Sequence, residues 1–147
     1  MSESRRWPAT VMAVLFVGYA VGKAARAREG RLGFPGGPPV SAADADRYPL
    51  DPVIAQTLAC VSGLVAAGIV LATVTSLGRR LPRWVILIAL AAVVLPVAAG
   101  AAIMSLDGFI GLGIGWRWYH GVVGIVCVAL SLETLRSYVA ATRRTHG

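Results

Sequence analysis

The run from Val53 to Leu77 constrains this fold more than any other segment, because it contains no charged residue. About 20 consecutive apolar residues cross the hydrocarbon core of a bilayer as one α-helix. A helix also satisfies its own backbone hydrogen bonds, which the interior of a bilayer requires. The run therefore predicts a membrane-spanning helix.

Three further apolar runs predict spanning helices at about residues 8–25, 84–106 and 118–138. The composition agrees, because 56% of the 147 residues are hydrophobic, 14% are charged and the mean hydropathy is +0.70. Such a chain is more apolar than ordinary soluble domains. We therefore predict an all-α fold, an integral membrane four-helix bundle in which residues 1–147 form a single transmembrane domain with a long loop at 26–52.

The first apolar run has two interpretations. It is barely long enough to span, and Arg5 and Arg6 before it resemble the charged start of a secretory signal peptide. Tyr19 and the spacing of Gly18 and Gly22 instead favour a retained helix that packs closely on a neighbour. We favour the retained helix and leave cleavage open.

Small residues mark a second place where helices can approach closely. Ala55, Ala59, Gly63 and Ala67 recur every fourth residue and so share one helix face. The third apolar run contains Pro96, which lacks the backbone N–H of a helix interior. We expect close packing at the first face and a kink at the proline.

The two longer loops differ in composition. In residues 26–52 a Gly- and Pro-rich stretch is followed by Ser41-Ala-Ala-Asp44, whose capping-box spacing predicts a short surface helix over residues 42–47. Residues 105–116 are Gly-rich. No strand precedes them and no Lys-Ser or Lys-Thr follows, which argues against a phosphate-binding loop. We expect this segment to lie at headgroup depth.

Four crossings place both termini on one side of the membrane. Residues expected there are Arg5, Arg6, Arg79, Arg80, Arg83, Arg136, Arg143 and Arg144; those expected opposite are Lys23, Arg26, Arg28, Arg31, Arg47 and Arg117. The positive-inside rule favours a multi-pass protein of the cell membrane with cytoplasmic termini. Because topology accounts for the net charge of +7, we expect no nucleic-acid partner.

The opposite face gathers candidate site residues, because the long loop and the segment from Asp107 to His120 meet there. Candidate ligand-binding residues are Arg26, Arg28, Arg31, Arg117 and Tyr119. Arginines bind phosphate or carboxylate, and His120 or Asp107 could handle a proton. The alternative is a solvated loop with local ion pairs.

Glu133 is the one carboxylate well inside an apolar run, and acids at membrane depth are often functional. Arg136 follows at i+3, so a structural ion pair is the alternative. The catalytic candidates are thus Asp107, His120 and Glu133. No Cys and His residues have metal-ligand spacing, and we expect neither metal nor cofactor.

A resemblance adds to this interpretation of the layout. The segment from Gly18 to Lys23, followed by Gly30 to Gly37, is similar to a family of small bacterial four-helix membrane proteins of unknown function. The similarity covers chiefly the first forty residues. It implies a four-span layout and a bacterial source, and it brings no activity.

We expect a non-enzymatic membrane protein that binds membrane lipids, a partner membrane protein or further copies of itself. An integral-membrane enzyme acting on a lipid-soluble substrate at the outer face is the alternative, and a small transporter is third. The sequence leaves open whether the protein is an enzyme.

Overall fold

The computed structural model describes residues 6–143, apart from the side chains of residues 77, 79 and 143. The terminal residues Arg5, Arg144 and His146 lie outside this range. Within it the chain forms α-helices and no β-strand. The helices are α1 (Trp7–Arg28), α2 (Ala42–Asp46), α3 (Pro52–Ala72), α4 (Ser76–Arg80), α5 (Arg83–Ile110) and α6 (Trp118–Arg143).

The predicted fold class is confirmed. Helices α1, α3, α5 and α6 are each long and apolar enough to cross a membrane. The predicted short surface helix is also present as α2, and the Ser41 hydroxyl accepts the backbone N–H of Asp44 as its N-cap. In the same way the Asp51 carboxylate caps α3 by accepting the N–H groups of Val53 and Ile54.

The ends of all four long helices differ from the sequence-based expectation, and α1 and α6 extend to Arg28 and Arg143. Helix α3 ends at Ala72, before the predicted end at Leu77. Thr73 donates its hydroxyl to a carbonyl of the preceding turn, and the short helix α4 follows. Helix α5 continues to Ile110 and stops at Gly111, which has a positive φ of 78° and donates its N–H to the Asp107 carbonyl. Asp107 therefore belongs to the last turn of α5, and the Gly-rich loop covers residues 111–117.

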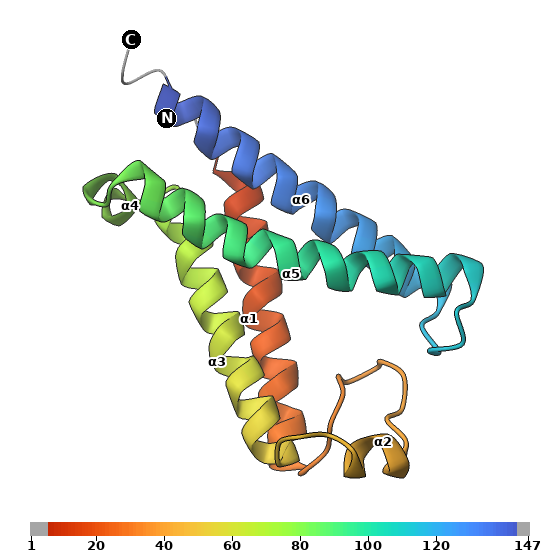
Figure 1. Cartoon of the computed structure of the whole chain (residues 1–147). Coiled ribbons are helices and arrows are strands. Elements are labelled where there is room, and N and C mark those ends of the chain that lie inside the picture. The colour runs from red at the N-terminus through yellow and green to blue at the C-terminus, as the bar shows by residue number, and fades with distance from the viewer. Residues whose placement is uncertain (1–5, 144–147) are drawn as a thin grey trace.

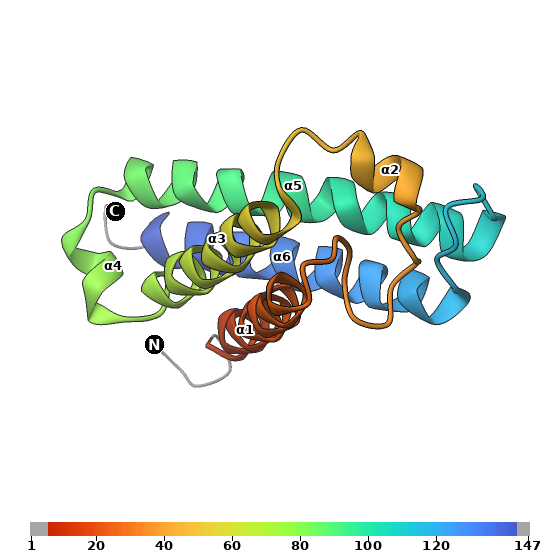
Figure 2. The same cartoon turned by 90° about the horizontal axis from the view of Figure 1, so that it is seen from below.

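The long helices form two antiparallel pairs, α1 with α3 and α5 with α6 (Figure 1). Contacts within each pair greatly outnumber those between pairs. The pairs converge where α1 and α5 begin and α3 and α6 end, which we call the apex, and they diverge toward the opposite end, which we call the loop end (Figures 1 and 2). The helices therefore pack as four only near the apex.

The largest cluster of buried apolar residues explains this shape, because its members lie in the apex halves of the helices or, for Leu130, at the middle of α6. Leu90 of α5 is completely buried at its centre. The buried cluster consists of Ala9, Met12, Val70, Ala72, Ile86, Leu90, Leu130 and Tyr138. The loop end depends instead on its loops for contact between the pairs.

Helix α5 differs from its neighbours in length. It has 28 residues and remains one helix across Pro96. At 1.5 Å per residue it is about 42 Å long, against about 30 Å for the hydrocarbon core of a bilayer. A helix of this length crosses such a core at a tilt or with an end projecting. In Figure 1, α5 runs steeply across the direction of α1.

Helices α1 and α3 touch closely at Gly63. A Cβ atom there would lie 2.9 Å from Cδ1 of Tyr19 and 3.2 Å from the Phe16 carbonyl oxygen. Ala67 on the same stripe is buried, whereas Ala55 and Ala59 are half-buried. The stripe of small residues thus faces α1 around Gly63.

The two glycines of α1 have different surroundings. A Cβ atom on Gly22 would lie 2.6 Å from the Phe34 ring, so this glycine makes room for the long loop. Gly18 is exposed, and a Cβ atom there would meet nothing within 4 Å. Close packing at Gly18 would need a partner outside the chain.

We predict that Gly63→Leu destabilises the protein by about 1–3 kcal/mol, because the larger side chain overpacks the contact between α1 and α3. The measurement is the free energy of unfolding in detergent. The matched control is Gly68→Leu, because a Cβ atom on Gly68 would meet nothing within 4 Å. The control should be neutral or stabilising, since leucine is the better helix former. Equal losses for both variants would contradict close packing at Gly63.

Candidate functional site

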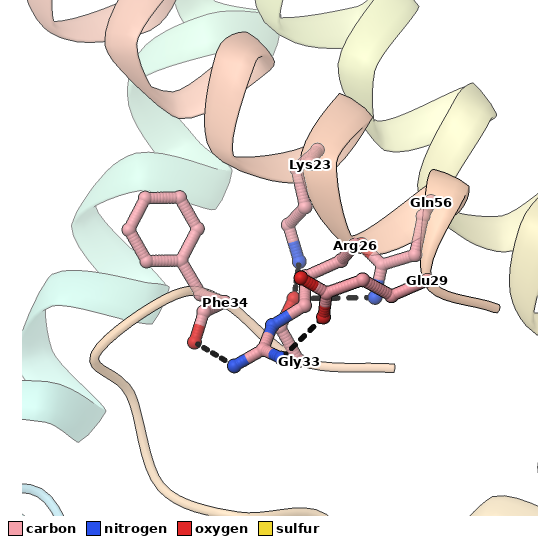
Figure 3. A network of polar contacts seen from close by, with 6 residues as sticks. All are labelled: Lys23, Arg26, Glu29, Gly33, Phe34 and Gln56. Atoms are coloured by element: carbon pink, nitrogen blue, oxygen red, sulfur yellow. Dashed lines mark hydrogen bonds and ion pairs between the residues drawn. The ribbon is translucent and has the colours of Figure 1, made fainter. Parts of the chain in front are cut away.

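The first part of the long loop is tied to α1 and α3 through one carbonyl group. The Lys23 ammonium from α1 and the Gln56 side-chain amide from α3 both donate to the Gly33 carbonyl oxygen, at 3.0 Å and 3.2 Å (Figure 3). Gln56 is buried, so its side-chain amide donates to the loop backbone rather than to solvent. The two helices thereby fix the place where the loop turns back.

Arg26 contributes to the same network. Its guanidinium forms an ion pair with Glu29 at 2.8 Å and reaches the Phe34 carbonyl oxygen at 3.5 Å (Figure 3). The candidate ligand-binding residues Arg28 and Arg31 are exposed, and no described residue forms an ion pair with them. Of these three arginines, the structure thus places one in loop anchoring and two at the surface.

An aromatic stack holds the loop against α1. The rings of Tyr19 and Phe34 lie parallel with their centroids 5.9 Å apart. The Lys23 ammonium lies 5.4 Å from the Tyr19 ring centroid, within the range of a cation–π contact. Because Gly22 has no side chain, Phe34 can lie directly on the helix backbone.

Asp107 holds the second loop. Its carboxylate is buried and accepts the backbone N–H of Ile114 at 3.1 Å on Oδ1 and that of Trp116 at 2.6 Å on Oδ2. A buried carboxylate is tolerated when such donors surround it. Both oxygens are therefore occupied by the Gly-rich loop that follows the helix.

His120 joins the two loops. Its Nδ1 accepts the Arg117 N–H at 3.2 Å, which places the ring proton on Nε2, and Nε2 donates to the Gly36 carbonyl oxygen at 3.1 Å. The ring also lies against Trp116 and Tyr119, with centroid separations of 5.0 Å and 4.2 Å. This contact agrees with the expectation that the two segments meet. Nε2 of His120 makes the bond between the loops, and Nδ1 bonds within the second loop.

Of the remaining candidates, Glu133 lies apart from this contact and the other two lie beside it. Glu133 is on α6, more than three turns from His120, where it lies 3.6 Å from Arg136 Nε and accepts the Ser137 hydroxyl. Arg117 and Tyr119 are exposed beside His120. The structure therefore brings Asp107 and His120 to the same loop end, but it does not bring Glu133 to them.

The site as a whole anchors loops. Lys23, Gln56, Asp107 and His120 each bond to loop backbone. Within residues 6–143 no three His, Cys, Asp or Glu side chains gather where a metal ion could bind. Sequence reasoning did not select Gln56, because a lone amide in an uncharged run gives no signal.

We predict that Asp107→Asn loosens residues 111–117, because the new side-chain NH₂ group faces a backbone N–H that needs an acceptor. Amide hydrogen exchange at Ile114 and Trp116 should become faster by about tenfold or more, as expected for the loss of one such bond. Asp46→Asn is the matched control, because Asp46 is exposed. Unchanged exchange in Asp107→Asn would contradict the anchoring role.

We also predict that His120→Phe releases the long loop, because phenylalanine keeps a ring but loses both hydrogen bonds. Trypsin should cut after Arg31 and Arg47 about fivefold faster, the change that corresponds to about 1 kcal/mol. Tyr119→Phe is the control, because the Tyr119 hydroxyl bonds to no described residue. If trypsin cleaves the wild type and His120→Phe at equal rates, His120 does not hold the long loop in place.

Comparison with known proteins identifies no relative of this chain. No protein-family model, no curated protein and no solved structure matches it. The function is therefore inferred from the chemistry of the chain itself.

Proposed function

We propose that the chain is a non-enzymatic multi-pass membrane protein that binds a partner membrane protein along α5, with both termini on the cytoplasmic side. The supporting observation is the exposed face of α5. This helix has the most apolar 18-residue window of the four, yet only 17% of that window is buried, against 28% to 33% in the others. The most apolar helix is thus the least covered by its own chain.

The exposed face of α5 has the spacing of a helix-packing seam. Its residues follow one another at alternating intervals of four and three, and all of them are exposed: Ile88, Ala92, Leu95, Ala99, Ala102, Leu106 and Phe109. We call this set the α5 seam. Intervals of four and three keep residues on one line of contact between two helices that cross at a small left-handed angle.

The sizes of the seam residues also favour a protein partner. Large side chains at Ile88, Leu95 and Leu106 are interspersed with alanines at Ala92, Ala99 and Ala102. Helices associate in lipid through van der Waals packing, which small residues improve by letting backbones approach. A second copy of the chain would be a partner of the same kind.

The loop-end geometry supports a binding role rather than catalysis. The oxygens of Asp107 accept loop N–H groups, and the ring nitrogens of His120 bond to the loops. A general acid or base must be able to reach a substrate proton. Glu133, the third catalytic candidate, bonds to its helix neighbours.

The test is co-purification of the full chain from native membranes in mild detergent, followed by mass spectrometry of the bound proteins. A stoichiometric partner is expected for the wild type. Ala99→Leu should reduce the partner at least about fivefold, because overpacking costs about 1–3 kcal/mol at a close helix contact.

The matched control is Ala129→Leu, which makes the same change at an exposed position of α6. It should retain the partner. If no protein co-purifies with the wild type, or if Ala99→Leu retains its partner in full, the seam does not bind a protein.

A further inference from the structure

The two ends of the molecule carry different charge. The apex carries one carboxylate, Glu133, and a surplus of three positive charges. Its four arginines with described side chains are Arg6, Arg80, Arg83 and Arg136. The loop end carries six basic and five acidic residues, a surplus of one positive charge. The basic residues are Lys23, Arg26, Arg28, Arg31, Arg47 and Arg117, and the acidic residues are Glu29, Asp44, Asp46, Asp51 and Asp107. An anionic partner is therefore attracted to the apex.

Arg83 is the best placed of the apex arginines. It is the first residue of α5 and is half-buried, and its Nε atom is buried without a hydrogen-bond partner. A buried N–H group without an acceptor is costly, so an outside acceptor stabilises it once a turn of the side chain brings it to the surface. Arginine also matches the geometry of phosphate oxygens with its fork of donors.

The backbone beside Arg83 favours an anion as well. The residue before α5, Pro82, provides no side-chain cap. Its carbonyl oxygen accepts the N–H groups of Val85 and Ile86, so the first two N–H groups of α5, at Arg83 and Trp84, have no acceptor among the described residues. These groups and the helix dipole favour negative charge at a helix N-terminus. The Arg83 guanidinium and the start of α5 therefore favour negative charge at the same position.

A small cavity also lies at the apex, and several residues with hydroxyl groups line it. Its volume is about 10 Å³, which has room for one water-sized group. The cavity is lined by Ala9, Thr73, Val74, Thr134, Ser137, Tyr138 and Ala141. The cavity thus places hydroxyl-bearing residues in the gap between α1, the end of α3 and α6.

We propose that the apex binds an anionic phospholipid, with the headgroup phosphate at Arg83 and the start of α5. The exposed Trp7 and Trp84 lie on the helix starts at this end, and exposed tryptophans prefer the headgroup layer. A phosphate group in that layer belongs to a lipid, which favours a lipid over a soluble phosphate. The proposal does not depend on the α5 seam or on a protein partner.

The test measures lipid binding to the full chain in neutral detergent by native mass spectrometry. Phosphatidylglycerol should bind more tightly than phosphatidylcholine of the same acyl chains. Arg83→Gln should weaken phosphatidylglycerol binding by about tenfold or more, as for the loss of a charge-assisted hydrogen bond. Arg117→Gln removes the same charge at the loop end and should change binding less than about twofold, because it removes no bond to the lipid.

A further variant and a competitor separate a specific site from other causes. Arg83→Lys keeps the charge and should bind phosphatidylglycerol with intermediate affinity, which would show that the folded apex tolerates substitution. Inorganic phosphate at about 50-fold excess over the lipid should not displace it, because a soluble anion lacks the acyl chains that hold a lipid at this depth.

The proposal is overturned if both lipids bind equally, or if Arg83→Gln and Arg117→Gln weaken binding equally. It is also overturned if inorganic phosphate competes with the lipid, because the site would then belong to a soluble anion.

Discussion

The structure of the loop end depends on one requirement. Loop backbone at the edge of a membrane needs hydrogen-bond partners. A helix satisfies its own backbone, but a loop packed against apolar helices does not. Lys23 and Gln56 meet this need at Gly33, Asp107 meets it in the Gly-rich loop, and His120 meets it at Gly36. Asp107 and His120, whose residue types often act in catalysis, therefore form hydrogen bonds that hold the loops.

Packing governs the apex in the same way that hydrogen bonds govern the loop end. The buried cluster around Leu90 joins all four long helices there, and the two pairs separate beyond it (Figure 1). Each pair keeps its own close contacts, such as that at Gly63. Because the pairs diverge, few other contacts join them at the loop end. The position of the long loop there depends more on the hydrogen bond from His120 to Gly36 than it would between packed helices.

The spanning helices and the Ser41 cap could be predicted from sequence, because each depends on local pattern alone. The position of Asp107 could not, because α5 extends past the expected end and places the carboxylate under the loop. The stripe at Gly63 indicated close approach but not the identity of the neighbour, which depends on tertiary packing. The divergence of the pairs has no sequence signal either, since no spanning helix concentrates its apolar residues strongly on one face.

Helix α5 connects the two proposed binding events. Arg83 begins the helix, and the α5 seam begins five residues later at Ile88, a rise of about 7.5 Å. At 3.6 residues per turn the two positions lie about 140° apart around the helix axis, so a lipid headgroup at Arg83 and a helix docked on the seam would occupy different faces near one end of α5. Where binding of one ligand changes the affinity for the other, the coupling acts equally in both directions. A partner that tightens lipid binding at the apex must in turn be held more tightly when the lipid is bound.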